Sequence, residues 1–329
     1  MKEYIGKINI SKDTMLFVLN DIFEQGISQN TTKENILKMI PEIYSEENLP
    51  DLIKMLPYDS YLTLEKLFKY LKRSNDINKF TRQVDYKGIH YLEEAMIIIM
   101  RARYSEYNYS INPGVLEKLD VLFNEKNRKL AEKYGEIEKL TQGLLYTYGI
   151  VEFNFLRTTI CRYIGKIVSE EELYDLYFKR LNLNTFVKYY NIVWTNTNQK
   201  ERFATYLDEE IVDLGKIACH QKNLGLEYKM CSKKYILQRE EFLWDEKANK
   251  LFEFVRLRAD YMFKIVFQNI QKKSEIGEDI FKELLFKCKL RNEKEIEEFM
   301  KLFMDWYNNS SQYPLCGYSP IELVNKIKR

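Results

Sequence analysis

The sequence predicts a mainly α, multi-helical protein with a winged-helix-like middle domain and one or two small β-hairpins. The 329 residues include only 12 glycines and 6 prolines, so long stretches lack the residues that tight turns require. Within these stretches, apolar residues recur at the spacing of an amphipathic helix. The chain is 45% hydrophobic, which is enough for a sizeable core. We expect an N-terminal helical domain (1–135), a winged-helix-like domain (136–207) and a C-terminal helical domain (208–329).

The N-terminal domain begins with helices whose start and stop residues can be read directly. Ser11 is a good N-cap for a first helix, which Gly26 can end. Thr32 starts a second helix, and we expect Pro41 to stop it. A serine at position 45, followed by two glutamates, opens a third helix.

The pattern then becomes less regular before it ends in a tyrosine-rich segment. Residues 61–72 carry leucines at helical spacing and predict a fourth helix, whereas the pattern loosens over residues 79–88. Helical spacing returns from about residue 91 to residue 101. The segment from Arg103 to Ile111 alternates polar and apolar residues, so we expect a small hairpin there.

The middle domain has the clearest order of elements. Two helices end at Gly149 and Gly165, which suit the left-handed conformation common after a helix. Ser169 and Glu172 form a capping box that opens a third helix. A hairpin is expected from Phe186 to Tyr206. Three helices followed by a hairpin is the order of a winged helix.

The last third is again predicted to be helical. Ser232 is a good N-cap, and Ser319, Pro320 and Glu322 together form a strong helix-start signal near the C-terminus. The other expected helices cover residues 208–220, 245–271, 276–289 and 293–307.

The tail resembles that of a known enzyme class. The segment DWYNNSSQYPLCGYSPIEL, residues 305–323, is similar to the end of integrase-core transposases. That resemblance implies a strand-rich core in which three carboxylates hold metal. The region before the tail is predicted to be helical, so we set this enzyme class aside.

A second resemblance covers more of the chain. The leucine-rich N-terminal helices, residues 148–177 and the GYSPIEL tail resemble uncharacterised Firmicutes proteins. Those proteins contain a region like the N-terminal domain of transcription terminator Rho. The resemblance implies no activity, and it favours a regulator or a mobile-element protein.

The sequence predicts no catalytic residue, metal or cofactor. It contains two histidines, His90 and His220, and no glycine-rich phosphate-binding loop. Cys219, His220 and Cys231 could supply three metal ligands, but their spacing matches no compact zinc module. Neighbouring side chains on a helix also point about 100° apart. Most paired acidic residues occur where helices are expected to start.

The cellular location is expected to be the cytoplasm. Five widely spaced cysteines, an odd number, favour a reducing compartment. The N-terminal segment MKEYIGKINISKD is too polar for a secretion signal. The most apolar run, AMIIIM at 95–100, is too short to span a bilayer, so we expect no membrane contact.

Two functional hypotheses follow, and we prefer the first. The protein is expected to be a non-enzymatic interaction or adaptor protein, such as a regulatory or a phage or mobile-element defence or counter-defence component. Glu170 and Glu171 would then meet a protein partner. The 51 basic and 49 acidic residues are nearly balanced, so there is no strong field to attract nucleic acid. An enzyme with a fold that we do not recognise ranks third.

The alternative is a nucleic-acid-binding transcriptional regulator that uses the winged helix. Phosphates would be contacted by five basic residues on the third helix and the wing: Lys179, Arg180, Lys188, Lys200 and Arg202. One feature opposes this reading, because Glu170 to Glu172 lie at the helix end that usually enters the major groove.

Overall fold

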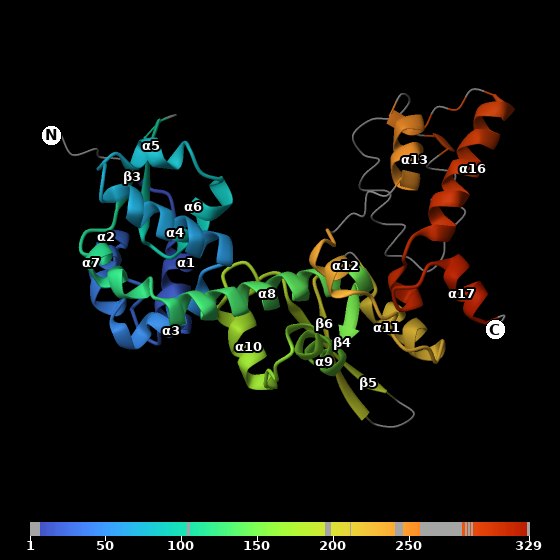
Figure 1. The fold of residues 1–329 in the computed structure, drawn as a ribbon, viewed down its shortest axis with the longest axis horizontal. Coiled ribbons are helices and arrows are strands. Elements are labelled where there is room, and N and C mark those ends of the chain that lie inside the picture. The colour runs from blue at the N-terminus through green and yellow to red at the C-terminus, as the bar shows by residue number, and fades with distance from the viewer. Residues whose placement is uncertain are drawn as a thin grey trace. The chain divides into compact units, whose positions relative to one another are not determined.

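The computed structural model confirms the mainly helical, multi-helical fold and contains two small three-stranded antiparallel sheets (Figure 1). It describes residues 7–103, 106–194, 199–210, 212–240, 246–256, 285–286, 288, 290 and 292–327. None of the helices in these ranges is both long and apolar enough to cross a membrane.

The chain divides into two compact units. Unit 1 contains residues 1–138 and 168–185, and unit 2 contains residues 139–167 and 186–329. The expected boundaries after residues 135 and 207 do not coincide with this division. Helix α8 (Glu125–Tyr148) runs through residue 135 without a break, and the helix after Ser169 belongs to unit 1.

Unit 1 consists of short helices and one sheet. Two of the predicted caps are present, because the Ser11 and Thr32 hydroxyls accept from backbone N–H groups three residues on. Ser45 precedes a 3₁₀ helix as its N-cap residue, but its side chain makes no cap hydrogen bond. The helical elements are α1 (Lys12–Leu16), the π-helix η1 (Phe17–Ile22), α2 (Lys33–Ile43), the 3₁₀ helix η2 (Glu46–Asn48), α3 (Leu49–Met55), α4 (Tyr58–Leu71), α5 (Ile77–Thr81), α6 (Tyr86–Glu94), α7 (Val115–Leu119), η3 (Asp120–Leu122), the first part of α8, and α10 (Glu170–Lys179).

Pro41 does not stop α2, contrary to the sequence expectation. The helix continues to Ile43 with the proline inside it. A proline has no N–H to donate, so the carbonyl of Leu37 would lose its helical partner. The buried Asn112 side chain replaces it, because Nδ2 donates to the Leu37 carbonyl at 2.9 Å. A tertiary hydrogen bond therefore compensates for the break.

The helix expected from residue 91 to residue 101 was also wrong. Helix α6 ends at Glu94, and Met96 has a left-handed φ of 56°, which interrupts the helix. The chain then forms β2 (Ile98–Arg103), which pairs with β1 (Lys7–Ile8) on one side and β3 (Glu106–Ile111) on the other. β-Branched isoleucines favour a strand, so the hairpin begins at Ile98 rather than at Arg103.

Unit 2 contains the predicted hairpin of residues 186–206. Strands β5 (Lys188–Trp194) and β6 (Gln199–Thr205) pair antiparallel, and β4 (Ile150–Glu152), which was not predicted, completes a sheet of order β4-β6-β5. The helical elements of unit 2 are the last part of α8, α9 (Phe153–Ile164), α11 (Leu214–Asn223), α12 (Lys233–Leu237), α13 (Glu246–Arg256), α16 (Glu293–Asn309), η4 (Tyr313–Leu315) and α17 (Pro320–Ile327).

Several helix ends in unit 2 agree with the sequence, and one does not. Gly149 and Gly165 adopt φ values of 72° and 67° after α8 and α9. The helix expected over 208–220 instead begins at Leu214, because Asp213 caps it by accepting from the N–H of Lys216. The expected helix over 245–271 is described only as α13, and most of the helix expected over 276–289 lies outside the described residues.

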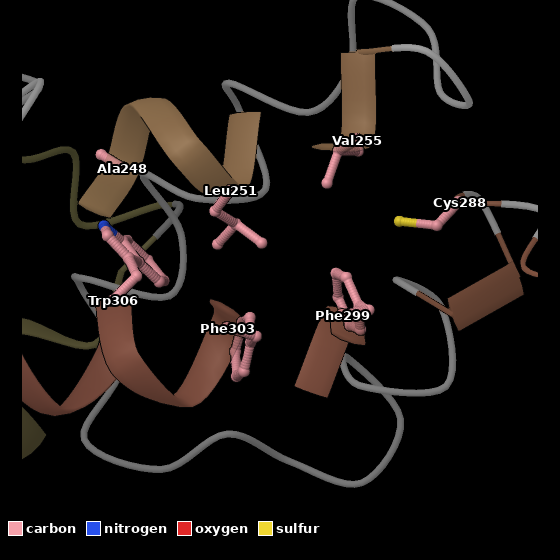
Figure 2. Packing of buried hydrophobic residues seen from close by; sticks show 7 residues of the cluster. All are labelled: Ala248, Leu251, Val255, Cys288, Phe299, Phe303 and Trp306. Carbon is pink, nitrogen blue, oxygen red and sulfur yellow. The ribbon is translucent and has the colours of Figure 1, made fainter. Parts of the chain in front are cut away.

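Two buried clusters form part of the described core of unit 2. In the first, α13 and α16 present apolar side chains to each other at helical spacing, as Figure 2 shows. Its residues are Ala248, Leu251, Val255, Cys288, Phe299, Phe303 and Trp306. The second lies between the sheet, α11 and the C-terminal segment, and consists of Ile150, Phe203, Leu207, Leu214, Ile217, Ala218 and Tyr313.

The C-terminal segment is fixed to unit 2 by polar contacts. The buried Gln221 Nε2 lies 2.7 Å from the carbonyl oxygen of Tyr313 and 3.2 Å from that of Ile150. The predicted capping box is present: the N–H of Ser319 donates to Glu322 at 2.9 Å, and the Ser319 hydroxyl accepts from the N–H of Glu322 at 3.4 Å. The GYSPIEL segment is therefore a helix start in this fold.

Candidate functional site

The candidate site is a pocket of about 470 Å³ in unit 1, which we call the α10 pocket. It is bordered by the start of the chain's first helix, by α6, and by α10 with the loop that follows it. Its polar and aromatic lining residues include Asp13, Phe17, His90, Glu94, Phe178 and Asn184. All of these belong to unit 1.

Two carboxylates give the pocket an acidic character. Asp13 lies in the first turn of α1, where the Ser11 cap fixes the chain direction. Glu94 is the last residue of α6, and its Oε1 lies 3.4 Å from Nε2 of His90. Burial raises the pKa of Glu94, while the neighbouring His90 opposes that shift. No lysine or arginine is among the lining residues that the structure describes.

Aromatic rings form the apolar part of the pocket. Phe17 and Phe178 meet edge to face with their ring centroids 5.8 Å apart. Phe178 is 48% exposed, so about half of its surface is accessible to a ligand. On the α6 side, the ring of His90 lies 5.0 Å from that of Tyr91, which also lines the pocket.

One further hydrogen-bond acceptor of the lining has no partner. The Oδ1 atom of Asn184, in the loop after α10, is buried and accepts no hydrogen bond in the structure. A buried polar atom without a partner costs free energy. The pocket therefore combines two carboxylates and an amide side chain with aromatic rings.

Helix α10 carries the acidic residues predicted to meet a partner. The side chains of Glu170 and Glu171 are exposed, whereas Glu172 pairs with Lys133 at 2.6 Å. The opposite side of the helix is buried through Leu173 and Leu176. Residues 171, 174 and 178 recur at helical spacing, so the exposed face runs from Glu171 towards Phe178 at the pocket.

Two of the five basic residues proposed to contact phosphates are paired with acidic residues inside unit 1. Arg180 is fully buried, and its Nε lies 3.5 Å from the buried carboxylate of Glu138. Lys179 lies 2.8 Å from Asp51 and 3.1 Å from Asp175, with little of its side chain exposed. Both cations are used inside unit 1, and the sequence alone did not reveal their acidic partners.

The three basic residues of the hairpin lie in unit 2, and they differ in environment. The Nζ atom of Lys188 lies 3.5 Å from Oδ2 of Asp208. Lys188 is on the face of the sheet that also carries Trp194. Lys200 and Arg202 are exposed on the other face. Only this second pair keeps the position that a phosphate contact requires.

Cys219, His220 and Cys231, which were considered as metal ligands and set aside, form no metal-binding group in the described part of the chain. Cys219 is exposed, and Cys231 is partly buried with its thiol directed at the Lys229 carbonyl. In the part of the chain that the structure describes, no group of three or more histidine, cysteine, aspartate or glutamate residues could hold a metal ion.

The sequence did not identify the α10 pocket. Its residues come from segments separated by about 70 to 170 positions, and none belongs to a recognisable motif. The rarity of histidine was the only available signal, because His90 is one of two in the chain. Comparisons with family models, curated proteins and solved structures find no match for this chain.

Proposed function

We propose that this protein is a protein-interaction module that binds a basic partner through the exposed face of α10. The main support is the difference in environment between the basic and the acidic residues at the two ends of this helix. Lys179 and Arg180 are bound internally, while Glu170 and Glu171 remain exposed. Phosphates would be repelled by such a surface, whereas a basic protein surface complements it.

The proposal predicts that neutralising the acidic start of α10 weakens partner binding. Glu170→Gln/Glu171→Gln should slow association with the partner several-fold, with little change in dissociation, because exposed charges act mainly on encounter rates. Glu172 is left unchanged since its carboxylate pairs with Lys133. The partner is first captured from the native host after nuclease treatment, and association is then measured by surface plasmon resonance.

A matched control is available in the same unit. Glu46 and Glu47 are also adjacent, exposed and in the first turn of a helix, so Glu46→Gln/Glu47→Gln changes the charge equally. This variant should bind at the wild-type rate. Loss of capture on nuclease treatment, or equal effects of the two variants, would contradict the proposal.

A second candidate function is nucleic-acid binding by the β5–β6 hairpin. On its outer face, Lys200 lies opposite Val193, and Arg202 lies opposite Asn191. The half-exposed Tyr189 lies on the same face, and none of the described positions of that face is acidic. A basic surface with an aromatic ring suits a nucleic-acid backbone and bases. The order α8, α9, α10 and hairpin is the one expected of a winged helix, but α10 belongs to unit 1 and the hairpin to unit 2.

This candidate predicts a specific change in salt dependence. Lys200→Ala/Arg202→Ala should weaken binding to a duplex of arbitrary sequence and lower the slope against log salt by about two. Lys188→Ala is the control, because Lys188 lies on the other face and pairs with Asp208. Fluorescence anisotropy at several salt concentrations measures the slope, and an unchanged slope would show that the hairpin does not contact the nucleic acid.

A further inference from the structure

We propose that the α10 pocket binds the cationic side chain of a protein partner, an arginine or a lysine. This inference rests on the proposed function, because it places part of the same partner at the end of the α10 face. It goes further by naming the group that is recognised and the residues that hold it.

Charge complementarity is the first argument. Asp13 and Glu94 border the pocket, and Asn184 lines it, although its Oδ1 atom is itself buried. Both carboxylates accept hydrogen bonds; Glu94 lies 3.4 Å from His90, and the described lining contains no lysine or arginine. Ammonium and guanidinium groups carry three and five donors and no acceptor, so they match this set better than a neutral or anionic ligand does.

The aromatic lining is the second argument. Cations are attracted to the faces of aromatic rings, and the aliphatic stems of lysine and arginine pack well on them. Phe178, which lines the pocket, has about half of its surface exposed, and Phe17 packs against it from η1. An apolar wall beside two carboxylates suits a charged group on an aliphatic stem.

The geometry of α10 indicates the spacing of the partner's charges. Glu171 and Phe178 are seven residues apart on one helix face, which corresponds to about 10 Å along the axis. A partner segment in the polyproline II conformation rises about 3.1 Å per residue with three residues per turn, so basic residues three positions apart would lie on one side of it and span about 9 Å. One would meet Glu171 while the other enters the pocket.

The test uses a labelled tetrapeptide, Arg-Ser-Gly-Arg, acetylated and amidated so that its ends carry no charge. We expect it to bind the full-length protein, and we expect the same peptide with citrulline in place of both arginines not to bind. Asp13→Asn and Glu94→Gln should each weaken binding roughly tenfold, because a charge-assisted hydrogen bond is lost. Phe178→Ala should also weaken it. Fluorescence anisotropy measures the affinities.

The controls separate the pocket from general acidity. Asp21→Asn removes an exposed carboxylate from η1 in the same unit and should bind as the wild type does. Asp13 is exposed, so its variant is expected to fold even if Glu94→Gln is unstable, and thermal melting checks both. Absence of binding, or equal binding of the citrulline peptide, would overturn the proposal.

Agmatine, a free guanidinium compound, tests the source of the cation. If agmatine binds as tightly as the tetrapeptide, the pocket serves a small molecule and the proposed protein partner is wrong. A peptide that binds more tightly than agmatine, and loses this advantage in Glu171→Gln, supports a protein partner.

Failure of this inference is distinguishable from failure of the proposed function. If Glu170→Gln/Glu171→Gln slows association with the captured partner while Asp13→Asn does not change its affinity, the interaction surface stands and the pocket proposal fails. If the pocket variants change tetrapeptide binding but the α10 variant leaves partner binding unchanged, the pocket proposal is supported and the proposed partner surface on α10 is wrong.

Discussion

Replacing Arg180 by methionine should lower the free energy of unfolding by about 3–5 kcal/mol, because it leaves the Glu138 carboxylate buried without its counter-charge. Arg180 is fully buried, and none of its three guanidinium nitrogens has a hydrogen-bond partner. Burial lowers the pKa of Arg180 to about 10, and it raises the pKa of Glu138. Both shifts show that the ion pair does not fully offset the loss of hydration.

The double variant should behave differently from either single variant. Glu138→Gln alone leaves a buried guanidinium unpaired and should also destabilise unit 1. It retains an oxygen that can accept from Asn182 Nδ2, which donates to Glu138 at 2.5 Å. Arg180→Met/Glu138→Gln removes both charges, so we expect its stability to return to within about 1 kcal/mol of the wild type. Urea denaturation followed by circular dichroism measures all four proteins.

This cycle also tests the discarded phosphate contact. If Arg180 were a surface residue that touches nucleic acid, Arg180→Met would reduce nucleic-acid affinity and leave the denaturation midpoint unchanged. Lys200→Ala provides the comparison, because Lys200 is exposed and its removal should not affect stability.

The features that the sequence predicted correctly are those set by neighbouring residues. Ser169 caps α10 by accepting from the N–H of Glu172, and Gly149 ends α8 with a left-handed φ. Both depend on fewer than five residues of chain, so the local sequence contains the needed information. The hairpin of residues 186–206 is similar, because its alternating pattern and polar turn lie within one segment.

The features that were missed depend on distant contacts. Pro41 is tolerated inside α2 because Asn112, 71 positions later, supplies a hydrogen bond to Leu37. Strand β2 was taken for helix because a buried central strand shows no alternation, and its partners β1 and β3 were not predicted as its neighbours. In such cases tertiary pairing overrides local propensity.

The candidate site shows the same limit for charges. The YFKR segment, residues 177–180, predicts a basic aromatic surface, yet Arg180 is paired with Glu138 and Lys179 with Asp51. A sequence gives the type of a charged residue but not the direction in which it points. The exposed acids of α10 could be predicted because they occupy the first turn, where acidic residues favour the helix dipole.

Glu93 should make the stability of unit 1 depend on pH in the direction opposite to a salt-bridged carboxylate. Its side chain is buried, and its Oε1 has no hydrogen-bond partner. Burial, with a smaller contribution from the charge of Glu94, raises the pKa of Glu93 to about 7. The folded state therefore binds this proton more tightly than the unfolded state, whose glutamate has an ordinary pKa of about 4.5.

The sign of the effect follows from this difference. Below pH 4.5 both states are protonated, and between about 4.5 and 7 only the folded state is, so stability falls as the pH rises through this window. After allowing for solvent screening, we expect Glu93→Gln to stabilise the protein by about 2 kcal/mol at pH 8 and to have little effect at pH 5. Urea denaturation at both pH values measures this, with the exposed Glu47→Gln as a control that changes neither value. An equal effect of Glu93→Gln on the free energy of unfolding at pH 5 and pH 8 would show that Glu93 does not titrate in this range. An NMR titration that gives the Glu93 carboxyl group an ordinary pKa would show the same.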